Sequence, residues 1–133
     1  MSGIKEDYAS DFFSSKNATE RITPRFINSL NPDEIFVFGS NIQGMHDGGA
    51  ARQAVEKFGA IMGQGTGLQG QSYAIPTMGG RAEMKHYINE FIQFADSHPE
   101  MKFFVTRIGC GIAGYSPKEI APMFAGAYSL PHV

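Results

Sequence analysis

The sequence has a single cysteine and no tryptophan, and its formal net charge is only −2. One cysteine excludes an internal disulfide and favours a reducing compartment, so we expect a cytoplasmic protein. The small net charge disfavours a nucleic-acid partner, because proteins that follow a phosphate backbone usually carry a basic stripe. No apolar run approaches the ~20 residues of a membrane helix, and we find no signal-peptide pattern, so we expect no membrane partner.

The amino-acid composition fits one small globular domain. Apolar residues make up 42% and charged residues 18% of the 133 positions, which is typical of soluble domains. Residues 1–21 are mostly polar and show no sustained period, so we interpret them as a leader and residues 22–133 as a single domain. The one cysteine and four histidines lack the spacing of a metal site, and we expect no metal and no cofactor.

Strands and helices alternate along the predicted domain. The apolar run at 34–39 is typical of a strand covered on both faces. The other predicted strands lie at 72–77, 102–109 and, as a short edge strand, 128–133. The predicted helices lie at 49–59, 81–99 and 117–127. The last begins with a capping box from Ser116 to Glu119, and Pro122 would weaken its interior. This alternation indicates an α/β domain with a largely parallel sheet.

Two glycine-rich loops each follow a strand and lead into a helix. They read "GSNIQGMHDGGAA" and "GCGIAGYSP". Ligands of open α/β sheets bind beyond the carboxyl ends of the strands, and a helix N-terminus attracts anions. The glycines that would let a phosphate approach the backbone are Gly48, Gly49, Gly109, Gly111 and Gly114. The two loops together predict a diphosphate site; the alternative is that these glycines serve only tight turns.

A third glycine-rich stretch, from Gly65 to Gly70, matches the letters GxGxxG. That dinucleotide fingerprint requires a strand before it and a helix after it. The residues that follow, "QSYAIP", are typical of a strand. We therefore interpret the stretch as a hairpin-like connection or as a loop that covers a substrate.

The two loops resemble those of the macrodomain family. "FGSN" and "DGGAA" stand where the family has Asn-Ala-Ala-Asn and a glycine triplet, so Asn41 matches the second asparagine. "GIAGYS", which ends at Ser116, is similar to the family's Gly-Ile-Tyr/Phe-Gly-Tyr-Pro. The longer "RIGCGIAGY" looks like the branch that removes ADP-ribose from acidic side chains, whose loop begins Ile-Gly-Cys-Gly-Leu. The resemblance covers about residues 35–124. It implies a three-layer α/β macrodomain-like fold, with a largely parallel or mixed central sheet flanked by helices.

The resemblance also implies a ligand, because macrodomains bind ADP-ribose or its relatives. Some members hydrolyse ADP-ribose from proteins or remove its terminal phosphate. The implied partners are therefore ADP-ribose or a similar nucleotide, and an ADP-ribosylated protein. Asn41 would contact the distal ribose, and Tyr115 would pack against that ribose or cover the site. The implied ligand-binding residues are Gly39, Ser40, Asn41, Gly48, Gly49, Ala50, Gly109, Cys110, Gly111, Ile112, Ala113, Gly114 and Tyr115.

The sequence departs from the branch that acts on acidic side chains. That branch uses a lysine near the middle strand, but no lysine occurs between Lys57 and Lys85. It also uses an aspartate in the second loop, where Ala113 or Gly114 stands here. Its mechanism is therefore not supported.

The candidate catalytic residues are His46, Asp47 and Asn41, beside the predicted phosphate site. His46 or Asp47 could activate a water, while Asn41 would hold the ribose. The alternatives are that His46 is a solvated loop residue and that Asp47 caps the helix. Arg107 would bind a phosphate or, as more arginines do, hold the fold through a carboxylate. Cys110 is interpreted as a small buried residue rather than a reactive thiolate.

The sequence thus predicts a protein that binds ADP-ribose or a related nucleotide diphosphate. It leaves open whether the chain hydrolyses an ADP-ribose linkage, as an ADP-ribosyl hydrolase or an ADP-ribose-1″-phosphate phosphatase. One alternative is a non-catalytic module that reads or sequesters a nucleotide. Another is a structural or interaction protein whose ligand site is filled by its own side chains.

Overall fold

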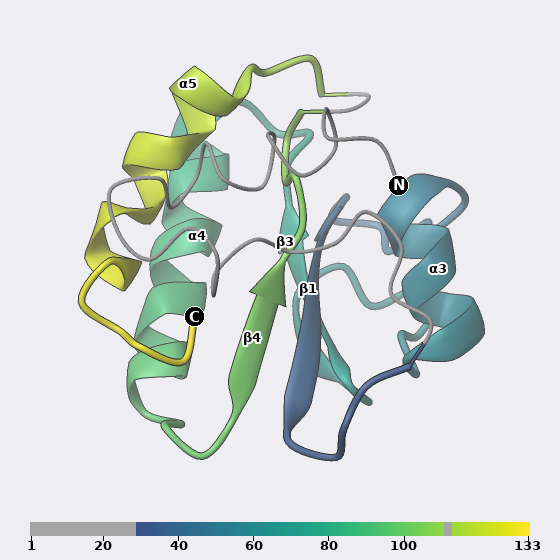
Figure 1. Cartoon of the computed structure of the whole chain (residues 1–133). Helices are drawn as coiled ribbons and strands as arrows, with labels where there is room; N and C mark the ends of the chain where they lie inside the picture. Colours follow the sequence, from purple (N-terminus) through teal and green to yellow (C-terminus); the bar gives the residue numbers. More distant parts are fainter. Residues whose placement is uncertain (1–28, 111–112) are drawn as a thin grey trace, which may run out of the picture.

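The computed structural model describes residues 29–110 and 113–133. The predicted leader and two predicted ligand-binding residues, Gly111 and Ile112, lie outside the described residues. The elements, in chain order, are β1 (Glu34–Ser40), α3 (Gly49–Lys57), β2 (Gly67–Gln69), β3 (Ser72–Pro76), α4 (Arg81–Asp96), β4 (Lys102–Val105), α5 (Pro117–Ile120) and the 3-10 helix η1 (Ala121–Ala127) (Figure 1).

The four strands form a mixed sheet in the order β2-β3-β1-β4. β1 lies in the interior and pairs in parallel with both β3 and β4, so that Val37 stands opposite Tyr73 on one side and Val105 on the other. β2 is a short edge strand that pairs antiparallel to β3. The structure confirms the predicted α/β class. The central sheet was predicted to be largely parallel or mixed, and it is mixed.

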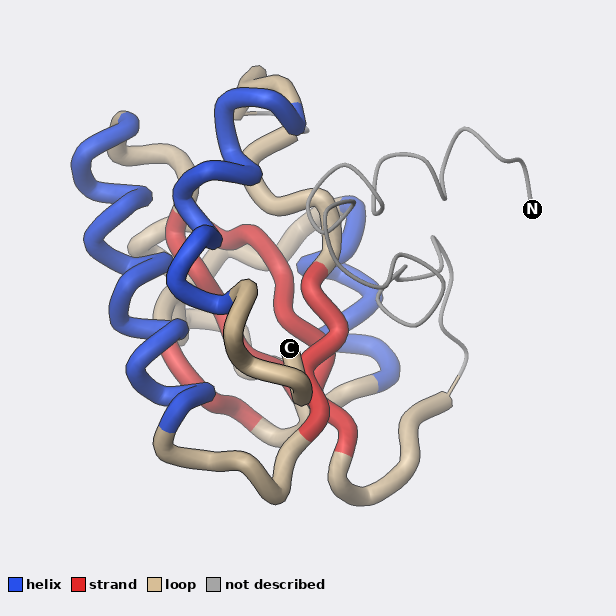
Figure 2. The backbone as a smooth tube through the Cα atoms, turned by 60° about the vertical axis from the view of Figure 1, so that its left-hand side comes forward, coloured by secondary structure: helices blue, strands red, loops and turns tan. Residues whose placement is uncertain are grey.

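Helices cover both faces of the sheet because the side chains of β1 point alternately to either side. Phe36 and Phe38 belong to a smaller core with α3 and Phe58. Ile35 and Val37 belong to a larger core with α4, α5 and η1. Figures 1 and 2 show the strands between these two groups of helices.

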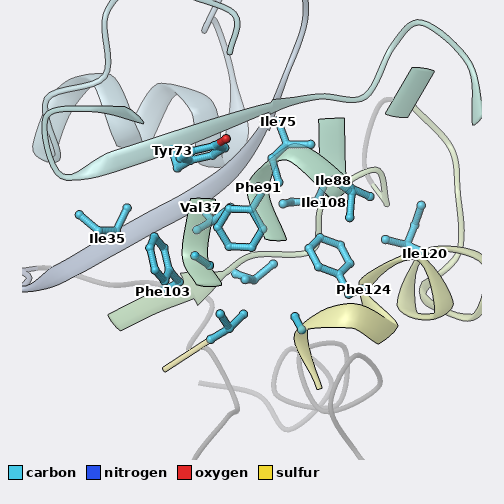
Figure 3. Close-up of a cluster of buried hydrophobic side chains, with 14 of the residues drawn as sticks. Ile35, Val37, Tyr73, Ile75, Ile88, Phe91, Phe103, Ile108, Ile120 and Phe124 are labelled. Atoms are coloured by element: carbon cyan, nitrogen blue, oxygen red, sulfur yellow. The ribbon is translucent and has the colours of Figure 1, made fainter. Parts of the chain in front are cut away.

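The larger core is built around the apolar stripe of α4. Met84, Ile88, Phe91 and Ala95 are fully buried. The ring of Phe91 lies edge-on to Tyr73 and Phe103, with centroid distances of 5.1 and 5.3 Å, and Figure 3 shows it among these neighbours. Burial of one such side chain stabilises the folded state by about 1.5–3 kcal/mol, so this stripe explains why 81–96 is a helix and where it packs.

Three details of the predicted elements are wrong. β4 ends at Val105, because Thr106 bonds through both its backbone N–H and its hydroxyl to the Val37 carbonyl and a turn follows. The helix predicted at 117–127 is α-helical only to Ile120, and the 3-10 segment begins at Ala121, next to Pro122, because proline cannot donate the α-helical bond. Residues 128–133 form turns rather than a strand, and a single backbone bond, from Phe103 N–H to the His132 carbonyl, joins them to β4.

Candidate functional site

The carboxyl ends of β1, β3 and β4 lie at one edge of the sheet, since these three strands are parallel. The first and last of the loops that leave this edge meet at glycines. A Cβ on Gly39 would lie 3.3 Å from Thr77 Cγ2 and 3.7 Å from the backbone nitrogen of Gly109. The structure therefore brings the starts of the two predicted glycine loops together.

The backbone conformation and the packing at position 109 both favour glycine. The φ of Gly109 is +77°, a backbone conformation that favours glycine. A Cβ there would lie 3.1 Å from both Ile120 Cδ1 and Met84 Sδ. This glycine lets the second loop pack closely on α4 and α5, so it serves packing as well as any ligand.

The N-terminus of α3 is open. Its N-cap is Gly48, which makes no side-chain cap bond, and the first turn contains no acidic residue. Among the described residues, no atom lies within 4 Å of a Cβ placed at Gly48 or Gly49. Among the described residues, the first-turn N–H groups therefore face no side-chain acceptor at the cap, and the nearest carboxylate in the sequence is that of the exposed Asp47, one residue before it.

His46 is buried and bonded rather than solvated. Its ring is 2% exposed, packs edge-on against Phe38 at a centroid distance of 5.1 Å, and bonds through Nε2 to the Gln64 carbonyl at 2.9 Å. A carbonyl only accepts, so Nε2 carries the hydrogen of this bond. Among the described residues the Nδ1 of His46 has no hydrogen-bond partner. The reading of His46 as a solvated loop residue is wrong.

Asp47, the next residue, is exposed. The prediction that it caps α3 is wrong, because the cap position falls one residue later, at Gly48, and has no side-chain bond. Its carboxylate therefore stays available at the start of the helix.

Asn41 and Ser40 hold the first loop in shape. Asn41 donates through Nδ2 to the Met45 carbonyl at 3.2 Å and accepts from the Met45 N–H at 2.8 Å, which closes the turn between them. The buried hydroxyl of Ser40 donates to the Gly65 carbonyl at 2.5 Å. Both predicted ligand-binding side chains thus have a structural bond already, although an amide retains capacity for further bonds.

The second loop presents Tyr115 and a bare glycine. Gly114 has φ +83°, and no atom of the part of the chain that the structure describes lies within 4 Å of its Cβ position. Tyr115 donates its backbone N–H to the Gly109 carbonyl at 2.9 Å and packs its half-buried ring against the larger core. The Arg81 guanidinium carbon lies 5.7 Å from that ring centroid, within the range of a cation–π contact.

A capping box fixes the end of this loop at α5. Ser116 Oγ accepts from the Glu119 N–H at 3.3 Å, and Glu119 Oε1 accepts from the Ser116 N–H at 2.9 Å, as the sequence predicted. Arg81 Nη2 lies 2.6 Å from Glu119 Oε2. The backbone bond from Ser116, more than the Arg81 charge, lowers the pKa of the Glu119 carboxyl.

The remaining predicted residues of the two loops are packed against a core or half-buried. Cys110 is half-buried against the larger core, with its Sγ 3.6 Å from the Ile108 carbonyl, so the interpretation of a packed thiol fits its place. Ala50 packs against the smaller core. Ala113 and Arg107 are half-buried.

The contact between the first loop and residues 61–65 was not foreseen from the sequence. A Cβ on Gly44 would overlap the backbone of Gly63 and Gln64, and a Cβ on Gly65 would overlap that of Asn41 and Ile42. The Gly63 N–H donates to the Gly44 carbonyl at 2.9 Å. We call residues 41–45 and 61–65 the paired loops. The only sequence signal was the density of glycine in both segments.

Residues 65–70 contain β2, and a turn at 70–71 leads into the antiparallel β3. No helix follows, so the stretch is a hairpin connection, as one of the two interpretations predicted, and not a dinucleotide fingerprint. Gln69, which is 3% exposed, organises it: its Oε1 accepts from the Ile61 N–H at 2.8 Å, and its Nε2 donates to the Gln64 carbonyl at 3.1 Å.

Two absences apply to residues 29–110 and 113–133. No helix in these ranges is both long and apolar enough to cross a membrane. In the same ranges, no three His, Cys, Asp or Glu side chains gather as metal ligands would.

No protein-family model matches the chain, and neither a curated protein nor a solved structure is found to be similar to it. The resemblance to macrodomains therefore remains a prediction that depends on the residues of the two glycine loops.

Proposed function

We propose that the chain binds ADP-ribose or a related nucleotide diphosphate at the carboxyl ends of β1, β3 and β4. The observation that carries the proposal is the open N-terminus of α3 at Gly48 and Gly49. The contact between Gly39 and Gly109 adds the second glycine loop at the same edge. A diphosphate accepts hydrogen bonds from first-turn N–H groups, and the helix dipole favours its negative charge.

The rest of the ligand would follow the two loops. Tyr115 would contribute its aromatic ring to a sugar contact, beside the ion pair of Arg81 with Glu119. Asn41 lies on the first loop, where its amide can still donate and accept beyond its two bonds to Met45. We infer that a ribose on the far side of the diphosphate would contact these two side chains.

Titration calorimetry with ADP-ribose tests the proposal directly. AMP is the control, because it has one phosphate and no second ribose. We expect ADP-ribose to bind more tightly than AMP. Folded protein that shows no heat with millimolar ADP-ribose would remove the proposal and favour a structural or interaction protein whose site is filled.

The Gly48→Val variant tests the place of binding. The φ of Gly48 is −150°, which any residue adopts, and its Cβ position is empty, so the variant should fold. The valine would cover the helix N–H groups, and we expect at least ~10-fold weaker binding, the effect of losing about 1.4 kcal/mol. Ala125→Val, at an exposed position of η1, is the control and should bind as the wild type does.

Hydrolysis of an ADP-ribose linkage is a second candidate function. It is favoured by the carboxylate of Asp47, which is exposed and does not cap α3. This carboxylate could accept a proton from the attacking water, whereas His46 Nε2 is already bonded to Gln64. The assay supplies ADP-ribosylated protein and ADP-ribose-1″-phosphate. Turnover that Asp47→Asn abolishes while binding persists would establish this role. Unchanged turnover would eliminate Asp47, and no product from the wild type would identify a reader.

A further inference from the structure

The start of α3 depends on the rest of the chain for its conformation. Gly48 and Gly49 have no Cβ, so their backbone is less restricted than that of any other residue type. Gly49 has a φ of +59°, in a region that few other residues adopt. A ligand that had to order this backbone on binding would lose affinity. The N–H groups here can hold a diphosphate well only if the chain on both sides fixes them beforehand.

α3 itself fixes this backbone on the C-terminal side. Ala51 and Ala54 are buried in the smaller core. The Arg52 N–H donates to the Gly48 carbonyl at 3.3 Å, which ties the cap residue to the helix. These contacts leave the N-terminal side of Gly48 to be fixed by the first loop.

The first loop is anchored by His46, two positions before Gly48. The imidazole ring is buried against Phe38, and its Nε2 donates to the Gln64 carbonyl at 2.9 Å. Gln69 Nε2 donates to the same carbonyl at 3.1 Å. One backbone oxygen therefore receives a side-chain N–H from the first loop and another from β2.

Gln69 is held in place by further hydrogen bonds. Its Oε1 accepts from the Ile61 N–H at 2.8 Å, and its Nε2 also donates to the Gly67 carbonyl at 3.3 Å. The paired loops are joined a second time where the Gly63 N–H donates to the Gly44 carbonyl. None of residues 61–69 is among the predicted ligand-binding residues, so their contribution to the site is to support the first loop.

We propose that His46 and Gln69 are positioning residues, which act through the Gln64 carbonyl to hold the backbone of Gly48 and Gly49 ready for the diphosphate. With exposures of 2% and 3%, neither side chain touches the ligand. His46 thus supports binding instead of activating a water. The inference rests on the proposed function and adds to it the part of the chain that sets the affinity of the site.

Two substitutions of His46 separate the hydrogen bond from the rest of the ring. His46→Gln retains an N–H donor for the Gln64 carbonyl, whereas His46→Leu fills the site without a donor. In calorimetry with ADP-ribose we expect His46→Leu to bind at least ~5-fold more weakly than the wild type, and His46→Gln to recover most of this loss. Gln69→Leu removes the donor on the β2 side and should weaken binding as well. Wild-type affinity in both leucine variants would overturn the proposal.

Ser72→Ala is the control for a loss of stability without a loss of position. The buried Ser72 hydroxyl donates to the Phe58 carbonyl at 2.8 Å, and Phe58 is the C-cap at the far end of α3. We expect this variant to bind ADP-ribose as the wild type does, and far-UV circular dichroism should show that all the variants are folded. Equal weakening by Ser72→Ala and His46→Leu would overturn the positioning role, because any lost buried hydrogen bond would then have the same effect.

Nitrogen-15 relaxation of the ligand-free chain separates this inference from the proposed function. We expect order parameters of about 0.85 for the amides of Gly48 and Gly49 in the wild type, His46→Gln and Ser72→Ala, and lower values in His46→Leu and Gln69→Leu. Unchanged order parameters in both leucine variants would overturn the inference whether or not ADP-ribose binds. Lower values in these variants, together with a wild type that binds no ADP-ribose, would support the positioning role and remove the proposed ligand.

Discussion

At the scale of single residues, His46 and Asp47 are neighbours in the sequence with opposite surroundings. His46 is enclosed by Phe38 and Gln64, whereas Asp47 faces solvent. The sequence could not separate them, because the burial of His46 depends on Gln64, eighteen positions further along the chain. Some glycine positions were more predictable: Gly48 and Gly49 follow from their place at the start of a helix, whereas the tight packing at Gly44, Gly65 and Gly109 was hidden.

These surroundings predict different effects of truncating the two residues. His46→Ala removes a buried ring and the bond to Gln64, so we expect the free energy of unfolding to fall by about 2–4 kcal/mol. Asp47→Ala, at an exposed site, should change it by at most about 0.5 kcal/mol. Urea denaturation followed by circular dichroism measures both. Equal effects of the two variants would contradict this account of the first loop.

Tyr73 predicts a change of stability in alkaline solution. Burial, with a smaller contribution from the Glu90 carboxylate, raises its pKa from 10.0 to about 12. The folded protein therefore holds the phenolic proton at a pH where the unfolded chain has released it. This contribution to stability is complete below pH 10 and is lost as the pH rises towards about 12.

The measurement is the urea midpoint of the wild type and of Tyr73→Phe from pH 9 upward. Phenylalanine cannot ionise, so we expect a shallower decline of stability with pH in the variant than in the wild type. Parallel curves for the two proteins would show that Tyr73 does not contribute to alkaline unfolding.

At the scale of elements, the sequence predicted the helices whose positions depend on interactions between residues close together in the chain. The apolar stripe of α4 and the capping box of α5 could be read from spacing alone, and both are present. The strand predicted at 128–133 failed because pairing needs a partner: this segment folds back on itself, with Leu130 N–H bonded to the Ala127 carbonyl. The paired loops could not be predicted, since no periodicity reports that Gly44 and Gly63, nineteen positions apart, will touch.

Gln69 is expected to hold the paired loops in place. Gln69→Leu keeps the volume but removes the acceptor for the Ile61 N–H and the donor to the Gln64 carbonyl. We expect the free energy of unfolding to fall by about 1–3 kcal/mol, with an unchanged denaturant dependence. Gln93→Leu, at an exposed position of α4, is the control and should differ from the wild type by at most about 0.5 kcal/mol. Equal losses in both variants would contradict the role of Gln69.

At the scale of the whole molecule, β1 couples the two cores. Phe36 and Phe38 enter the core under α3, while Ile35 and Val37 enter the one under α4. The pattern was predictable in outline, because a continuous apolar run indicates a strand covered on both faces. Since one strand serves both cores, neither face can lose its packing without disturbing the other, and we expect the domain to unfold in one step.

Tyrosine fluorescence can test this coupling, because the chain has no tryptophan and four of its five tyrosines, Tyr73, Tyr87, Tyr115 and Tyr128, lie in or against the larger core. Phe36→Leu disturbs only the other core, where its ring packs 4.9 Å from that of Phe58. We expect a loss of about 1–2 kcal/mol, reported equally by tyrosine emission and by far-UV circular dichroism in urea. A tyrosine midpoint that stays in place while the dichroism midpoint falls would show that the two faces unfold separately. The N-terminus of α3, a helix that packs on the smaller core, would then be free to rearrange independently of the second glycine loop. A ligand that contacts both α3 and the second glycine loop would in that case bind more weakly than a ligand that contacts only α3.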